Sequence, residues 1–201
     1  MGGDLSPGRL LLAYSQGIFP WYSDTKPILW WSPDPRLVLF PDELKIANSL
    51  RRVIKKNIFE VTFDRAFRRV IQACADVRTS VGDGTWITGE MVEAYVRLHE
   101  LGYAHSFESW HEGQLVGGLY GVALGRVFFG ESMFAAKTDA SKVALVRMVQ
   151  LLREWDFEFV DCQTTTEHLK RFGAREITRE EFLMRLAGTI EEGSYFGNRL
   201  E

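Results

Sequence analysis

The sequence predicts an α+β protein with a small N-terminal α/β domain, residues 1–80, and a larger C-terminal domain, residues 81–201. Its 201 residues fit either one large domain or a small and a medium one. Helical apolar spacing dominates the first part, whereas three consecutive strands are expected between residues 104 and 134. Gly82 and Gly84 mark the loop at which we place the boundary.

In the N-terminal part, Ser6 and Pro7 match the N-cap and first position of an apolar helix that ends at Gly17. Four of the six prolines lie between residues 20 and 35, which indicates extended or turning backbone. A short strand is expected over residues 36–40. Apolar spacing then predicts helices over residues 43–57 and 65–76.

In the C-terminal part, Thr88 can cap a helix that runs to about residue 101, where Gly102 ends it. Strands are expected over residues 104–110, 115–124 and 127–134, with turns at Gly113 and Gly125. A helix over residues 141–154 and a strand over 157–162 follow. A helix near residues 166–172 and a short acidic helix complete the prediction.

The composition is that of a folded protein, with 46% hydrophobic and 25% charged residues. Cys74 and Cys162 do not suggest a disulfide framework, and the four histidines have no close cysteine spacing, so we expect no metal site. No apolar run reaches the roughly 18 residues of a membrane span. The start shows no secretory signal, so we expect a cytoplasmic protein.

The basic residues are unevenly distributed. Residues 45–69 hold eight Lys and Arg against two acids, a net charge of +6 in a chain of net charge −3. Like charges four apart on a helix are mildly destabilising unless an anion lies across them. The alternative is an ordinary solvated helix face. The basic candidates on the predicted helix are Arg51, Arg52, Lys55 and Lys56.

Three polar residues on two strands are candidates for chemistry. Glu131 follows Gly130 in an apolar strand, where a carboxylate is costly to bury without a partner. Asp161 and Gln163 lie two apart on one strand and share a face, whereas Val160 faces the other way. The plainer alternatives are a strand-end Glu facing water and an Asp that caps the next helix.

Most of the six tryptophans are expected to fill the core. Trp21, Trp30 and Trp31, however, lie in the proline-interrupted segment rather than at helical spacing. Rigid, irregular aromatic surfaces of this kind can stack on a nucleobase, which is worth roughly 1–3 kcal/mol. Trp86, in the loop between the predicted domains, is a similar candidate.

Short motifs along the chain complete the picture: Gly2-Gly3-Asp4-Leu5, Tyr14 with Gly17-Ile18-Phe19-Pro20-Trp21, Trp30-Trp31-Ser32-Pro33-Asp34-Pro35-Arg36, Gly84-Thr85-Trp86-Ile87-Thr88, His105-Ser106, Leu115-Val116-Gly117-Gly118-Leu119-Tyr120-Gly121, Gly130-Glu131-Ser132-Met133-Phe134, Asp161-Cys162-Gln163, His168-Leu169 and Gly173-Ala174. Each motif alone is a weak signal, but their ordered combination is specific. On these motifs the chain closely resembles the leucyl/phenylalanyl-tRNA–protein transferases over nearly its whole length.

The resemblance implies an enzyme that moves Leu or Phe from tRNA to a protein with an N-terminal Arg or Lys, which marks that protein for degradation in bacteria. Transfer of Met is also plausible. The resemblance further implies a C-terminal domain similar to the acetyltransferase (GNAT) fold, with a mixed sheet. The reaction needs no metal or other cofactor, and we expect a monomer that acts away from membranes.

The resemblance also assigns roles to residues. Gln163 would contact the attacking amine through its side-chain carbonyl, and Asp161 would polarise Gln163 or draw the proton. Glu131 would help to arrange them or neutralise the basic N-terminal side chain. The remaining expected roles are the 3′-adenosine site (Trp21, Trp86), the donor side-chain pocket (Leu119, Phe128, Val160) and the tRNA phosphate patch (Arg51, Arg52, Lys55, Lys56).

Two other readings remain open. An acetyl-CoA-dependent acetyltransferase of the same fold would need a glycine-rich pyrophosphate loop, but residues 135–142 contain no glycine. A non-catalytic tRNA- or RNA-binding module could use the basic patch and the tryptophans. It gives no reason for Glu131, Asp161 and Gln163 to converge, and an assay of Leu transfer would discriminate.

Overall fold

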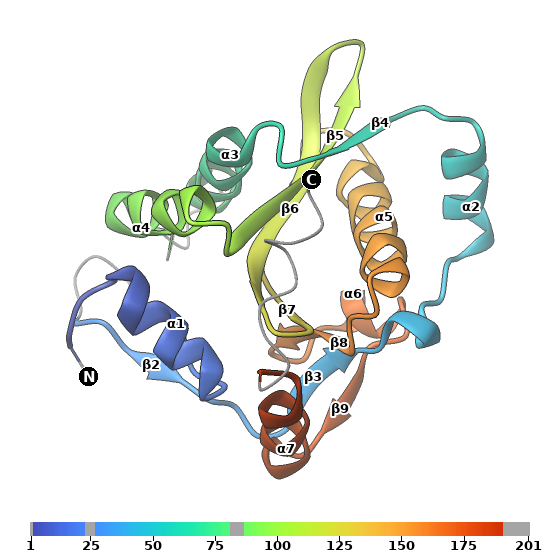
Figure 1. Cartoon of the computed structure of the whole chain (residues 1–201). Helices are drawn as coiled ribbons and strands as arrows, with labels where there is room; N and C mark the ends of the chain where they lie inside the picture. Colours follow the sequence, from blue (N-terminus) through green and yellow to red (C-terminus); the bar gives the residue numbers. More distant parts are fainter. Residues whose placement is uncertain (1, 23–26, 81–86, 191–201) are drawn as a thin grey trace.

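A computed structural model of the chain describes residues 2–22, 27–80 and 87–190. Within these residues a mixed sheet has the strand order β4-β5-β6-β7-β8-β3-β9, and a second small sheet pairs β1 with β2 (Figure 1). The strands are β1 (Phe19–Pro20), β2 (Trp30–Trp31), β3 (Arg36–Leu39), β4 (Glu60–Phe63), β5 (Ala104–His111), β6 (Gln114–Leu124), β7 (Val127–Ala135), β8 (Phe159–Gln163) and β9 (Arg175–Ile177).

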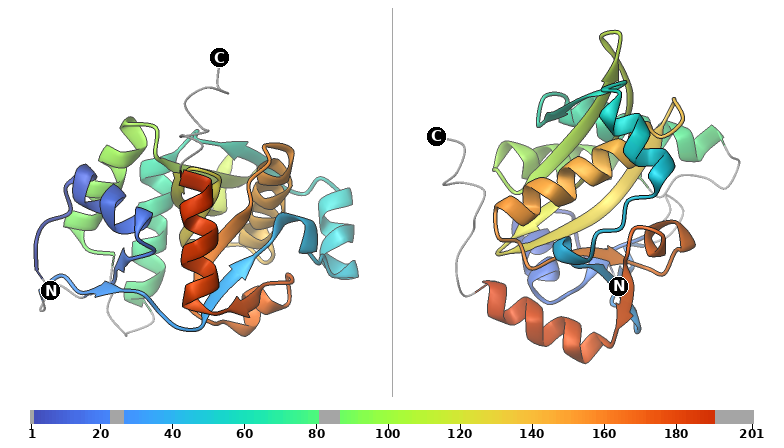
Figure 2. Two further views of the ribbon diagram at one scale, coloured as in Figure 1. Left: turned by 60° about the horizontal axis from the view of Figure 1, so that its bottom comes forward. Right: turned by 90° about the vertical axis from the view of Figure 1, so that its right-hand side faces the viewer.

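Helices cover both faces of the large sheet (Figures 1 and 2). One face packs against α1 (Pro7–Ser15), α3 (Phe67–Ser80), α4 (Gly89–Glu100) and α7 (Arg179–Ile190). The other packs against α2 (Asn48–Lys55) and α5 (Ala140–Glu154). The sheet therefore separates two hydrophobic clusters, and α1 and α2 lie at opposite sides of α5 (Figures 1 and 2). The remaining short elements are the 3-10 turn η1 (Pro41–Glu43) and α6 (Glu167–Lys170).

The mixed sheet confirms the predicted α+β fold class. The three hairpin strands β5, β6 and β7 begin and end within a residue or two of the predicted bounds. Thr88 caps α4 as expected, because its hydroxyl accepts a hydrogen bond from the Met91 backbone N–H at 3.2 Å. Gly113 and Gly125 adopt the positive φ that the turns before β6 and β7 require.

One prediction of local structure was wrong, and two strands were missed. The helix expected over residues 43–57 is instead η1, an extended stretch and the shorter α2. Strands β4 and β9 were not anticipated, because both are short edge strands, of four and three residues, that pair with strands distant in sequence.

The large sheet crosses the position at which the sequence places a domain boundary. Strands β3 and β4 precede residue 80, yet β4 pairs with β5, and β3 lies between β8 and β9. Residues 36–63 are thus part of the same sheet as the C-terminal strands. Within the described residues, no helix is long and apolar enough to cross a membrane.

Candidate active site

A cavity opens where strands β7 and β8 part. The two strands are parallel and joined through α5, and their pairing ends at Phe129 and Asp161. Beyond that point the strands border a cavity of about 370 Å³, a size typical of small-ligand sites. The cavity receives one wall from each strand, which brings Glu131 of β7 near Gln163 of β8.

Glu131 occupies a β-bulge in β7. Across the β6–β7 pair, Tyr120 lies opposite Ser132 and Gly121 opposite Gly130, which leaves Glu131 as the extra residue. Ser132 lies on the same face of the sheet as its cross-strand partner Tyr120. Tyr120 and Tyr14 belong to one hydrophobic cluster on that face, and the Tyr14 hydroxyl donates to Glu131. The bulge therefore turns two consecutive polar residues toward one side of the sheet.

Asp161 is fixed by a buried arginine. Arg36 of β3 donates from Nε to Asp161 Oδ1 at 2.8 Å and from Nη2 to Oδ2 at 2.7 Å. Both side chains are shielded from solvent, and the guanidinium also donates to the Gly17 carbonyl at 3.1 Å. Such a bidentate charge-assisted pair fixes the orientation of the carboxylate.

Gln163 is held by both carboxylates. Its backbone N–H donates to Asp161 Oδ1 at 2.9 Å, and its side-chain Nε2 donates to Glu131 Oε1 at 2.8 Å. Its φ of +61° ends β8 in the left-handed region, where a residue needs local support. Both oxygens of Asp161 therefore already accept hydrogen bonds from protein donors, and its contact with Gln163 is made through the Gln163 backbone N–H.

Glu131 is buried and receives donors from three elements. Tyr14 OH of α1 lies 2.8 Å from Oε1, and Tyr95 OH of α4 lies 3.2 Å from Oε2, in addition to the Gln163 amide. Burial raises the pKa of Glu131 from an ordinary 4.5 to about 7, against the lowering effect of these donors. The structure thus brings Glu131, Asp161 and Gln163 together as the sequence predicted.

The other side of the cavity is apolar. The three predicted pocket residues, Leu119, Phe128 and Val160, all line it and are almost fully buried. Sequence reasoning missed three further lining residues that come from β7 and α5. These are Met133, Leu145 and Met148.

Trp21 lies at the cavity and keeps an exposed ring. The side chain is 43% exposed, and its ring packs at a tilt against Trp31, with 5.9 Å between the centroids. The Trp31 indole N–H donates to the Trp21 carbonyl at 2.8 Å, which holds the pair in place. This surface can stack on a planar group. Trp86, the other predicted adenosine contact, lies outside the described residues.

The basic patch is borne by α2 and its end. Arg51, Arg52, Lys55 and Lys56 are exposed, and among the described residues none of them forms an ion pair. Two other basic residues of the charged window, by contrast, are paired on the surface, Arg65 with Glu60 and Arg68 with Glu93. These unpaired charges lie on α2 and its end, at the far side of α5 from β2, whose Trp31 packs against Trp21 (Figure 1).

Arg36, Tyr14 and Tyr95 are the site-supporting residues that sequence reasoning did not assign. A basic residue at the start of the apolar run Leu37–Phe40 was the available signal for Arg36. Tyr14 appeared only as part of a family motif, without a role, and Tyr95 gave no signal. The two lie on separate helices, 81 residues apart, and meet through tertiary packing.

An apolar cavity beside a clamped amide and a buried carboxyl is suited to hold an acyl group while a polar partner attacks it, as in an acyltransferase. Comparison with known proteins identifies the family to which this acyltransferase belongs. Residues 38–187 match the sequence model of the leucyl/phenylalanyl-tRNA protein transferases, and residues 3–34 match the model of their N-terminal domain. The chain belongs to the leucyl/phenylalanyl-tRNA–protein transferase family and is an enzyme of that kind.

Relatives named leucyl/phenylalanyl-tRNA–protein transferase are similar over almost the full chain. The protein of Syntrophobacter fumaroxidans is 69% identical over 192 residues, which cover 96% of this chain and 82% of that protein. The protein of Anaeromyxobacter sp. strain Fw109-5 is 59% identical over 197 residues, covering 98% and 84%. A solved aminoglycoside acetyltransferase from an uncultured soil sample is 16% identical with a TM-score of 0.44, covering 59% of this chain and 86% of that one.

Proposed function

We propose that this enzyme transfers Leu or Phe, and also Met, from aminoacyl-tRNA to the α-amine of a protein that begins with Arg or Lys. The modified protein is thereby marked for degradation in the cytoplasm, where charged tRNA is found, and the enzyme acts as a monomer. The observation that carries the proposal is the clamped amide of Gln163 at the edge of the apolar cavity.

The reaction is the aminolysis of an ester. The acceptor nitrogen attacks the ester carbonyl, the bond to the ribose 3′-oxygen breaks, and the nitrogen loses a proton as the leaving oxygen gains one. Glu131 fixes Gln163 by its nitrogen, and no described residue donates to its oxygen. The carbonyl of Gln163 can therefore accept a hydrogen bond from the attacking amine. Because an amide is a weak base, its main contribution is orientation.

Charge supports a basic acceptor. An N-terminal Arg or Lys carries two cationic groups, and Asp161 is already neutralised by Arg36. Glu131 is then the carboxyl left to balance an incoming cation, so an acceptor of this kind is favoured over a neutral one.

The donor would be held at three places. The apolar wall suits a Leu, Phe or Met side chain, and Trp21 offers a ring on which the terminal adenine can stack. Trp86, which lies outside the described residues, keeps its predicted role in binding the adenosine. The α2 patch would bind phosphates farther along the tRNA, without reading its sequence.

The decisive experiment is transfer of labelled Leu from tRNA to a peptide with N-terminal Arg. We expect rapid single-turnover transfer by the wild type and a marked loss of rate in Gln163→Ala. Gln72→Ala, which alters an exposed glutamine of α3, serves as the control. Unaltered rates in both Gln163→Ala and Asp161→Ala would contradict the assignment, and tRNA binding without any transfer would favour a non-catalytic RNA-binding module.

A further inference from the structure

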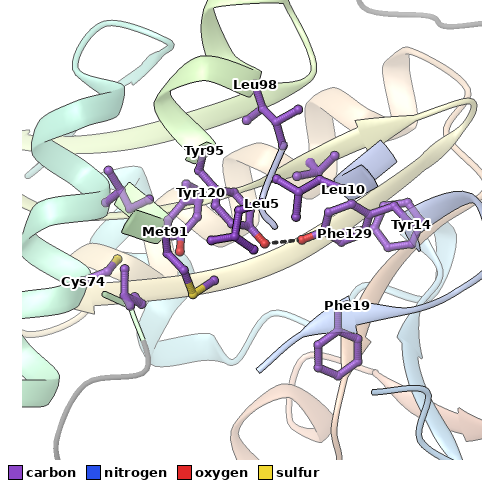
Figure 3. Packing of buried hydrophobic residues seen from close by; sticks show 14 of the residues in the cluster. Leu5, Leu10, Tyr14, Phe19, Cys74, Met91, Tyr95, Leu98, Tyr120 and Phe129 are labelled. Carbon is purple, nitrogen blue, oxygen red and sulfur yellow. Dashed lines mark hydrogen bonds between the residues drawn. The ribbon is translucent and has the colours of Figure 1, made fainter. Parts of the chain in front are cut away.

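Glu131, Tyr14 and Tyr95 form a closed triangle of hydrogen-bonding oxygens. The two phenol oxygens lie 2.5 Å apart, and each also lies within hydrogen-bond distance of one Glu131 oxygen, at 2.8 Å for Tyr14 and 3.2 Å for Tyr95. Figure 3 shows the two tyrosines pointing toward one another, with their hydroxyl groups joined. The three groups come from α1, α4 and β7 and are all buried.

A count of the available protons favours a neutral Glu131 in the triangle. Each hydrogen-bonded contact between two oxygens needs one hydrogen, and a phenol supplies one. Burial raises the pKa of both tyrosines well above its ordinary value, so each phenol keeps its proton at neutral pH. Two phenol protons cannot satisfy three contacts. A third proton on the Glu131 carboxyl completes the triangle, and Gln163 can donate to Oε1 in either state.

The surroundings of Glu131 favour the neutral form. Among the described residues no Lys or Arg forms an ion pair with it. Asp161 of β8 is the nearby anion and opposes a second negative charge, although Arg36 of β3 pairs with it. Tyr22 is a further titratable group, and it interacts electrostatically with Tyr95.

We propose that buried Glu131 is a protonated carboxyl in the free enzyme, with Tyr14 and Tyr95 as positioning residues that orient it, and that a cationic acceptor N-terminus makes Glu131 release this proton. The first half concerns the free protein, and the second rests on the proposed function. On release the O–H bond of the carboxyl breaks and the proton passes to solvent. The carboxylate then accepts from both phenols and from Gln163 while it faces the acceptor cation.

The coupling between acceptor binding and the ionisation of Glu131 follows from thermodynamic linkage. A positive charge beside a carboxyl favours its ionised form, so acceptor binding lowers the pKa of Glu131. Reciprocally, ionised Glu131 binds the acceptor more tightly, and acceptor affinity rises with pH through the titration of this group. The enzyme thereby presents a charged carboxyl mainly when a basic N-terminus is bound.

The state of Glu131 can be tested in the free protein by infrared difference spectroscopy as a function of pH. We expect a protonated-carboxyl band at about pH 5.5 that titrates away near pH 7 in the wild type and is missing in Glu131→Gln. Tyr14→Phe or Tyr95→Phe should raise the midpoint, because each removes a donor to the carboxylate. Tyr103→Phe, which changes a half-buried tyrosine outside the triangle, should leave it unchanged. No Glu131 band at low pH, or a midpoint unmoved in both triangle variants, would overturn the first half.

The release step is tested by calorimetry with an N-terminal Arg peptide in buffers of different ionisation enthalpy. At about pH 6.5 the wild type should release up to one proton more than Glu131→Gln, which corrects for titration of the peptide amine. Binding with equal proton release in the two proteins would overturn the coupling. Failure of the peptide to bind would overturn the proposed acceptor and the release step with it, whereas the infrared titration would still decide the state of Glu131.

Discussion

Arg36 and Asp161 lie 125 residues apart in sequence and form a bidentate ion pair from which solvent is excluded. Arg36 also lies over the rings of Phe19 and Phe182, with its guanidinium carbon 5.0 and 4.4 Å from their centroids. One side chain thus joins the segment that leads to Trp21, helix α7 and the strand that carries Gln163. The polar centre of the site is therefore anchored from the N-terminal part of the chain.

Breaking this ion pair should destabilise the protein strongly. Arg36→Met leaves Asp161 buried and unpaired, which costs about 3–5 kcal/mol. The double variant Arg36→Met, Asp161→Leu should regain much of that loss, because no charge then remains buried. Denaturant unfolding of the three proteins measures the difference. A cost below about 1 kcal/mol for the single variant would show that the carboxylate finds another partner.

The stability of the protein should depend on pH through Glu131. Its folded pKa of about 7 lies above its ordinary 4.5, so the folded state retains a proton that the unfolded chain has lost. Stability should therefore fall by up to about 3 kcal/mol as pH rises from about 4.5 to 7, relative to Glu131→Gln. Unfolding both proteins at the two ends of this range measures the effect. Parallel pH profiles would show that Glu131 titrates normally.

Removing the exposed ring of Trp21 should weaken donor binding. If adenine stacks on it, Trp21→Ala loses roughly 1–3 kcal/mol, which is about a 5- to 150-fold rise in the apparent KM for aminoacyl-tRNA. Trp21→Phe should lose less. An aminoacyl-adenosine analogue should show the same loss, because it retains the base. Unchanged KM values for both donors would remove Trp21 from the adenosine site.

Neutralising the α2 patch should weaken the binding of aminoacyl-tRNA much more than that of the short aminoacyl-adenosine analogue. Replacing Arg51, Arg52, Lys55 and Lys56 by Gln should raise the KM for tRNA and lower the slope of its logarithmic salt dependence by about 3 units. The aminoacyl-adenosine analogue should be affected far less, because α2 lies beyond α5 from β2, whose Trp31 packs against Trp21 (Figure 1). The paired variant Arg65→Gln, Arg68→Gln is the matched control. Equal loss with both donors would show that the patch does not grip tRNA.

The apolar wall should give a graded donor preference. Each methylene in such a pocket is worth about 1–3 kcal/mol, so Leu should be transferred more than 10-fold faster than Ala from the same tRNA. Met148→Ala, which enlarges the wall contributed by α5, should reduce the advantage of Leu. The ratio of single-turnover rates measures it. Equal transfer of Ala and Leu by the wild type would contradict a donor pocket here.

Local signals predicted much of the fold. The hairpins at Gly113 and Gly125 and the cap at Thr88 depend on residues close in sequence, and their chemistry is legible there. Edge strands β4 and β9 were not predictable, because pairing with distant partners decides them.

The candidate site likewise contains some features that the sequence predicts and others that it does not. Asp161 and Gln163 could be placed on one face from the period of a strand, and Glu131 stood out as a carboxylate in an apolar run. The register shift that makes Glu131 a bulge residue depends on β6, and its tyrosine partners come from two separate helices. No local pattern carries such information, so the support of the site required the tertiary structure.

The place of β3 between β8 and β9 has a consequence for biosynthesis. A ribosome releases β3 long before β8, and Arg36 must wait for Asp161 before its charge is neutralised. The contacts that join Arg36, Asp161 and Gln163 can therefore form only after residue 163 has emerged from the ribosome, long after β3.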